Sequence, residues 1–204
     1  MSGASSVYEF QPGLILGFHG CDREVGLAVL NGREQHLKPS EKEFDWLGSG
    51  VYFWEGDPTR ALEWAQAKAS RGNLRTPFVL GAVIDLRHCL DLFDRAAIEE
   101  VRQAHGTLKE GLRAYGSPMP KNTGKAPDWS GRMLDCAVIN FLHLSRARRA
   151  VTQPGWEEYD SVRGPFLEGS PIYPGAGFRS HTHIQICVRN PMCIKGYFRP
   201  LALA

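Results

Sequence analysis

Five stretches of the chain carry the apolar or alternating patterns of β-strands. Residues 14–18 form a short unbroken apolar run, residues 51–54 a short aromatic run behind two glycines, and residues 78–86 a longer apolar run. Residues 183–189 alternate polar and apolar side chains with a period of two, and residues 193–198 resume after an Asn-Pro turn. The last two stretches therefore predict a β-hairpin at the C-terminus.

Four other stretches have apolar positions at helical spacing. They are residues 22–30, 57–70, 94–105 and 129–150. Asp22 and Asp57 are placed to cap the first two, because an aspartate side chain accepts hydrogen bonds from the free amides of a first helical turn. Pro58 fits the first position of the second helix. Since strands dominate the two ends of the chain and helices its middle, the expected class is α+β.

The composition is that of one globular domain. The 204 residues are 43% hydrophobic and 23% charged, which argues against a disordered chain. Residues 116–128 hold three prolines and are expected to form a surface loop, and the glycine- and proline-rich residues 164–177 a second loop. A single domain covering residues 1–204 is therefore expected.

Charge and end sequences narrow the class of protein further. The net charge of +2, from 24 basic and 22 acidic residues, excludes a strongly basic protein of the kind that coats nucleic acid. The N-terminal sequence MSGASSVYEF has no basic or apolar region of a signal peptide, and no apolar run approaches the roughly 18 residues of a membrane span. The expected location is the cytoplasm, without a membrane partner.

Several common sites are disfavoured by the spacing of their residues. The five cysteines include no CxxC pair, so neither a zinc site nor a disulfide framework is expected. His181 and His183 lack a third ligand nearby in the sequence, and no metal is expected. Cys136 lies within an apolar helical stripe, which indicates a buried thiol rather than a protease nucleophile. Gly48-Ser49-Gly50 precedes a strand rather than a helix, so it is not a phosphate-binding loop.

Three motifs in order resemble a known family. His19-Gly20 follows the first apolar run, Gly48-Ser49-Gly50-Val51-Tyr52-Phe53 comes some thirty residues later, and Gln185 lies in the alternating run near the C-terminus. This order is similar to the catalytic domain of the poly-ADP-ribose-polymerase-like ADP-ribosyltransferases. The resemblance covers residues 13–90 and 160–200. Residues 91–159 have no counterpart, and we expect them to form a largely helical insertion.

The resemblance implies a fold and a set of cofactor contacts. The implied fold has split, curved, antiparallel or mixed β-sheets flanked by helices, with NAD held in the cleft. His19 would hydrogen-bond the ribose, and Tyr52 would stack on the nicotinamide ring. The backbone of Gly20 would contact the carboxamide. The remaining implied cofactor-binding positions are Ser49, Gly50 and Phe53.

The third signature position departs from the most familiar pattern of the family. Where a glutamate is frequent, this chain has Gln185. A hydrogen bond to a charged group contributes about 1.5–3 kcal/mol and a neutral one about 0.5–1.5 kcal/mol, so the exchange costs on the order of tenfold in rate. Gln185 favours single transfer over chain elongation, or a carboxylate supplied by another residue. Glu168 is the candidate supplier and would act as the general base on the acceptor; the alternative is a solvated loop glutamate.

The resemblance thus implies a mono-ADP-ribosyltransferase, a glycosyltransferase that uses NAD as co-substrate and needs no metal. The catalytic set is His19, Tyr52, Glu168 and Gln185, and the acceptor is either a protein or a nucleic acid (RNA or DNA). The small size resembles the toxins of toxin–antitoxin and phage-defence systems, which implies antiviral defence and a neutralising antitoxin as partner. A catalytically silent module that binds NAD, ADP-ribose or a partner is the main alternative. A relative of the tRNA 2′-phosphotransferases ranks lower, because the basic His/Arg set is missing.

Overall fold

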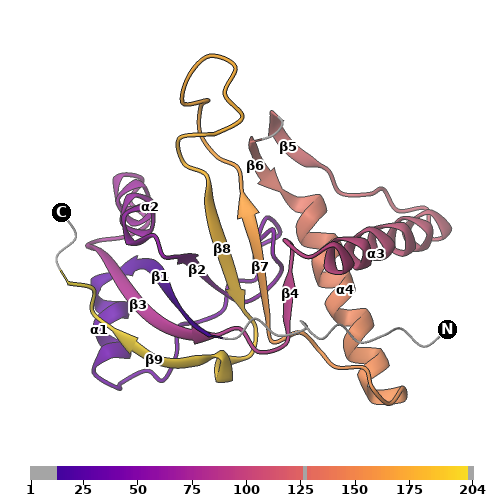
Figure 1. Ribbon diagram of the computed structural model, residues 1–204, viewed down its shortest axis with the longest axis horizontal. Helices are drawn as coiled ribbons and strands as arrows, with labels where there is room; N and C mark the ends of the chain where they lie inside the picture. Colours follow the sequence, from indigo (N-terminus) through magenta and orange to yellow (C-terminus); the bar gives the residue numbers. More distant parts are fainter. Residues whose placement is uncertain (1–12, 126–127, 202–204) are drawn as a thin grey trace.

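A mixed seven-stranded sheet runs through the middle of the molecule, in the order β4-β7-β8-β2-β1-β3-β9 (Figure 1). The computed structural model describes residues 13–125 and 128–201. Its neighbouring strands are antiparallel except β4 and β7, which are parallel. The strands of this sheet are β1 (Leu14–Asp22), β2 (Val51–Glu55), β3 (Pro77–Asp85), β4 (Cys89–Asp91), β7 (Ser161–Phe166), β8 (His183–Val188) and β9 (Ile194–Phe198).

Helices α1 (Arg23–Leu30) and α2 (Pro58–Ser70) cover opposite faces of β1 and β3. A Cβ on Gly20 would lie 2.3 Å from the carbonyl oxygen of Ala61 in α2, whereas the sulfur of the next residue, Cys21, faces Gly26 in α1. Successive side chains of a strand point to opposite faces, so the two helices sandwich the sheet here. The predicted caps are confirmed. Asp22 accepts a hydrogen bond from the amide of Glu24, and Asp57 accepts one from the amide of Arg60.

The middle of the chain forms two long helices and a small hairpin on the other side of the molecule (Figure 1). Helix α3 (Arg95–Ala114) packs against α4 (Met133–Thr152), and the hairpin of β5 (Asn122–Lys125) and β6 (Asp128–Arg132) leads into α4. The helix expected from residue 129 therefore begins four residues later. Residues 129–132 belong to β6 instead. Gly131 pairs with Thr123, and the approach is so close that a Cβ on Gly131 would lie 2.5 Å from the Thr123 hydroxyl.

Two expectations at the C-terminal end are wrong. Strands β8 and β9 do not form a hairpin: β8 pairs with β2 and β7, and β9 pairs with β3 at the far edge of the sheet. The 3₁₀ turn Pro191–Cys193 carries the chain across the sheet instead. The loop expected over residues 164–177 begins later than predicted, because residues 164–166 belong to β7. The sequence did not indicate this strand, since Gly164 and Pro165 lie inside it. The chain between β7 and β8 projects from the sheet as a long loop (Figure 1).

The sheet is weakly joined at its centre. Strands β1 and β2 pair through two residue pairs, Gly17 with Glu55 and Phe18 with Trp54, after which they diverge. By contrast, β1 and β3 pair over nine residues. We call the place where β1 and β2 diverge the seam.

The α+β class and a large mixed sheet flanked by four helices in the described residues are confirmed. The main core lies under the sheet and contains fully buried residues of several strands, such as Phe53, Leu80 and Ile186. A second core beneath α4 includes Trp46 and Leu142. None of the helices within the described ranges has the length and apolar character that crossing a membrane requires.

Candidate functional site

A cavity of about 300 Å³ opens at the seam and brings together five residues that the sequence singled out. We call it the central cavity. The five are His19, Gly50, Tyr52, Glu168 and Gln185. They come from β1, the entry to β2, β2 itself, the loop after β7, and β8. The predicted positions therefore converge in space although they are far apart in the chain.

His19 takes the place of a missing backbone partner. Its Nδ1 lies 2.7 Å from the carbonyl oxygen of Tyr52, at the point where pairing of β1 with β2 has ended. A carbonyl oxygen can only accept, so Nδ1 carries the proton and Nε2 is left as an acceptor. Burial lowers the pKa of His19, and its hydrogen bond to Tyr52 opposes this more weakly. The imidazole is therefore neutral at physiological pH.

Tyr52 presents its ring rather than its hydroxyl. The hydroxyl donates to the carbonyl oxygen of Gly48 at 2.8 Å and accepts from the amide of Leu47 at 2.9 Å. Burial raises the pKa of Tyr52 far above its ordinary value of 10. With its hydroxyl engaged and its proton held, Tyr52 is suited to stacking and not to proton transfer.

Gln185 is oriented by a tryptophan. The indole Nε1 of Trp46 donates to Oε1 of Gln185 at 2.6 Å. An indole nitrogen can only donate, so this contact fixes which end of the amide is the oxygen. The guanidinium of Arg132 stacks on the Trp46 ring at 4.1 Å, and its Nε donates to Asp135 at 2.5 Å. A continuous chain of contacts thus runs from the start of α4 to Gln185.

Glu168 is held by an arginine of α2. Both of its carboxylate oxygens accept from Nη2 of Arg60 at 2.7 Å. The side chain of Arg60 is 16% exposed and that of Glu168 30%, so the pair is largely shielded from water. His183 lies 3.8 Å from the same carboxylate. Glu168 is therefore an anchored carboxylate in the cavity wall and not a solvated loop residue.

Three of the expected cofactor positions lie outside the wall of the central cavity. Gly20 faces α2, where it allows the close approach of Ala61. The amide of Ser49 donates to the side chain of Asn140 in α4. Phe53 is fully buried in the main core, so its ring packs the sheet and cannot reach a ligand.

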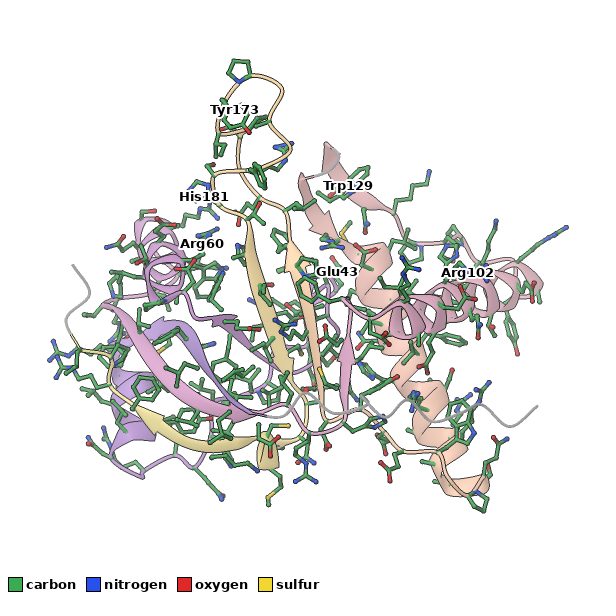
Figure 2. The ribbon with its side chains drawn as sticks, in the orientation of Figure 1. Glu43, Arg60, Arg102, Trp129, Tyr173 and His181 are labelled. Carbon is green, nitrogen blue, oxygen red and sulfur yellow. The ribbon has the colours of Figure 1, made fainter. Side chains whose placement is uncertain are left out.

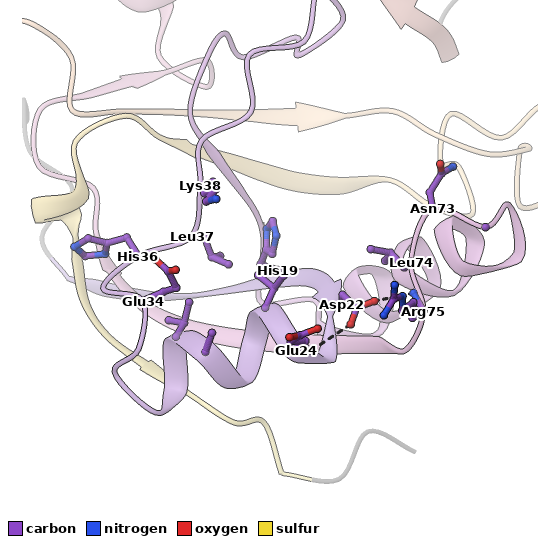
Figure 3. Close-up of a pocket in the computed structure, with 14 residues that line it drawn as sticks. His19, Asp22, Glu24, Glu34, His36, Leu37, Lys38, Asn73, Leu74 and Arg75 are labelled. Carbon is purple, nitrogen blue, oxygen red and sulfur yellow. Dashed lines mark hydrogen bonds between the residues drawn. The ribbon is translucent and has the colours of Figure 1, made fainter.

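A second cavity, of about 650 Å³, lies beside the first and shares His19 and Lys38 with it. Figure 3 shows His19 between the segment of Leu37 and Lys38 and the end formed by Asp22 and Arg75. Asp22 accepts there from the backbone amides of Glu24 and Arg75. His19 thus lies where two cavities meet.

The sequence interpretation missed several residues of the central cavity. Arg60, Trp64 and Lys68 all line it. They are spaced four residues apart in α2, and this i, i+4, i+8 pattern was a readable sign of one shared face. Trp129, at the β5–β6 hairpin in Figure 2, lines the cavity together with Arg132. No sequence motif points to either, because their segment has no counterpart in the family pattern.

The cysteines near the cavity are poor nucleophiles. All five cysteines of the chain are free thiols. Burial raises the pKa of Cys21 to about 12 and that of Cys187 further still. Both stay protonated at neutral pH, and the thiolate is the reactive form. Among the described residues, no group of three or more His, Cys, Asp or Glu side chains is arranged to hold a metal.

Comparison of the chain with protein-family models, with curated proteins and with solved structures finds no match.

Proposed function

We propose that this chain is an NAD-dependent mono-ADP-ribosyltransferase with an ADP-ribosyltransferase fold, which transfers ADP-ribose to a protein or nucleic-acid acceptor. The observation that carries the proposal is the convergence of His19, Tyr52 and Gln185 on one cavity at the seam. Residues of these types, in this order, gave the motif resemblance. Their meeting in one cavity is what the proposed activity requires.

The two cavities suit the two halves of a dinucleotide. In this proposal the nicotinamide half of NAD occupies the central cavity, where the ring of Tyr52 is fixed as a platform. Nε2 of His19 accepts a hydrogen bond from a ribose hydroxyl. The adenosine half occupies the second cavity, and the two halves join near His19 and Lys38, which line both.

The reaction needs positioning more than strong acids or bases. The bond between ribose C1′ and the nicotinamide nitrogen breaks, and nicotinamide leaves as a neutral molecule with the bonding electrons. The acceptor's lone pair forms the new bond to C1′, and its proton passes to a base, for which Glu168 is the candidate. Fixed ribose and fixed leaving group lower the barrier by removing freedom before the reaction.

Gln185 also favours one alternative. Its neutral amide offers less stabilisation to a positively charged ribose than a carboxylate would. A silent module that binds NAD or ADP-ribose, without transfer, is therefore the second candidate. Binding of NAD without release of nicotinamide would support that candidate over the enzyme.

The biological setting proposed is that of a cytoplasmic toxin in a toxin–antitoxin or phage-defence system, neutralised by an antitoxin. Its support is the resemblance to small toxins of this enzyme class. Induced expression in bacteria tests it: the chain should arrest growth, and the His19→Ala variant should not. Normal growth at full expression of the unaltered chain contradicts this role.

The activity is tested by incubating the full chain with NAD labelled in the adenine half, together with cell extract. We expect released nicotinamide by chromatography and label on protein or on nucleic acid. His19→Ala and Tyr52→Ala should abolish both signals, whereas Lys109→Ala, at an exposed position of α3 that lines neither cavity, should leave them unchanged. Absence of both signals from the unaltered chain would refute the enzyme.

A further inference from the structure

Two lysines line the central cavity from different elements. Lys42 belongs to the segment between α1 and β2, and Lys68 to α2. Each ammonium lies over an aromatic ring: Lys42 is 5.7 Å from the centre of the Phe44 ring, and Lys68 is 5.2 Å from that of Trp64. The rings hold the two cations at the cavity wall.

Neither ammonium has a carboxylate partner among the residues that the structure describes. The two arginines of the same cavity differ in this respect, since Arg60 pairs with Glu168 and Arg132 with Asp135. Burial lowers the pKa of Lys68, and the nearby positive charges of Lys42 and Arg71 lower it further. Asp45 lines the same cavity, but its Oδ2 accepts from the backbone amide of Lys42 at 2.7 Å and forms no ion pair with either ammonium. The two lysines therefore repel each other without a direct ion-pair partner in the described part of the chain.

Such an arrangement costs stability in the free protein, and a bound anion relieves it. Lysine binds phosphate well as a compact point charge, and the partial burial of Lys68 strengthens that attraction. Two ammonium groups converging on one cavity match the charge and the several oxygens of a phosphate. We propose that Lys42 and Lys68 form a phosphate-binding clamp in the central cavity.

The clamp goes beyond the proposed function and does not depend on it. Its phosphate has two possible sources: the pyrophosphate of NAD or a phosphate carried by the acceptor. Lys38 lines both cavities, whereas Lys42 and Lys68 line the central one alone. Phosphate binding is therefore measured first, and the source of the phosphate second.

The first measurement is calorimetric titration of the full chain with inorganic pyrophosphate, without NAD. Lys42→Met and Lys68→Met remove the charge and keep the apolar stem over its ring. Each should weaken binding about tenfold, because a hydrogen bond to a charged group is lost. Lys109→Met, at an exposed position of α3, should leave binding unchanged. Equal binding by the unaltered chain and the double variant overturns the clamp, as does binding by neither.

Thermal unfolding separates loss of the clamp from loss of the fold. Removing one of two repelling charges should leave the melting temperature unchanged or raise it. A fall in melting temperature of either variant, parallel to its loss of binding, assigns the lysine to the fold and overturns the clamp.

The source is found by repeating the titrations with NAD and with a short single-stranded oligonucleotide. Weaker binding of NAD alone by the double variant assigns the clamp to the donor, and weaker binding of the oligonucleotide alone assigns it to the acceptor. Either result supports the clamp, and no change with both ligands overturns it. Because pyrophosphate is titrated without turnover, the clamp stands even where no nicotinamide is released.

Discussion

Trp46 donates its indole hydrogen to Oε1 of Gln185 across 2.6 Å, joining a loop residue to one in β8 that lies 139 positions later. The bond fixes the amide so that its oxygen faces the indole. The orientation of Gln185, on which the proposed reaction depends, is thus fixed by Trp46, which lies outside the family motifs. This relationship makes Trp46 a positioning residue.

Trp46→Phe should lower the rate of nicotinamide release without loss of the fold. The ring still stacks under Arg132, but Gln185 loses its hydrogen-bond donor. We expect a fall of about tenfold in kcat, with KM for NAD changed less, because a mispositioned amide affects the transition state most.

The double variant tests whether Trp46 acts through Gln185. Trp46→Phe combined with Gln185→Leu should be no slower than Gln185→Leu alone, because the shared interaction is lost once. Multiplicative losses in steady-state kinetics contradict a positioning role. Circular dichroism of each variant serves as the control for folding.

Gln185→Glu should raise the rate of NAD cleavage. A carboxylate still accepts the hydrogen bond of Trp46, and its charge stabilises the positive ribose in the transition state. The charge-assisted bond predicts a gain of up to about tenfold in kcat for nicotinamide release. A slower Gln185→Glu variant contradicts the proposed direction of stabilisation.

Glu168→Gln should separate transfer from hydrolysis. The amide keeps one oxygen for Arg60 but no longer accepts the acceptor's proton. Transfer of label to the acceptor should therefore fall more than release of nicotinamide to water. Both rates are measured in one reaction by chromatography of nicotinamide and counting of labelled acceptor, and an equal fall in both excludes Glu168 as the acceptor's base.

Gly48→Ala should destabilise the protein more than Gly155→Ala. Both glycines have positive φ, +80° and +86°. A Cβ at Gly48 would lie 2.8 Å from Oδ1 of Asn140 in α4, whereas nothing lies within 4 Å of a Cβ at Gly155. The backbone cost of about 1–2 kcal/mol is common to both, so the difference in free energy of unfolding by urea measures the close contact. Equal losses contradict the packing of Gly48 on α4.

Acid should destabilise the fold through His143. Burial, followed by the charges of Arg189 and Arg146, lowers the pKa of His143 from 6.5 to about 3. The unfolded chain then binds a proton that the folded chain does not, so stability is present above pH 6.5 and is lost as the pH falls toward 3. His143→Phe should reduce the slope of unfolding free energy in this window by about 1.4 kcal/mol per pH unit. An unchanged slope of unfolding free energy against pH contradicts the burial of His143 in its neutral form.

The sequence was informative where one local signal decides a structure. Asp57 followed by Pro58 predicted the start of α2, and the order of His19, Tyr52 and Gln185 predicted residues of one cavity. Long-range pairing was not readable in this way. Strands β8 and β9 flank an Asn-Pro turn yet pair with β2 and β3, because burial in a seven-stranded sheet outweighs the pairing of one hairpin.

Residues that act by positioning other residues also could not be predicted from the sequence. Trp46 and Arg132 matter because the fold stacks them beside Gln185. Lys42 and Lys68 matter because the fold brings them to one cavity with no ion-pair partner among the described residues. Phe53 is the reverse case: the motif implied a cofactor contact, but the side chain is fully buried and packs the sheet.

The seam between β1 and β2 has a consequence for motion. Few backbone hydrogen bonds cross it, and His19 supplies one of the links by its contact with Tyr52. A molecule that spans the central cavity bridges the two halves of the sheet where they share the fewest bonds. Amide hydrogen exchange in β1 and β2 should therefore slow on binding more than exchange in α3, so the same two strands that form the pocket report its occupancy.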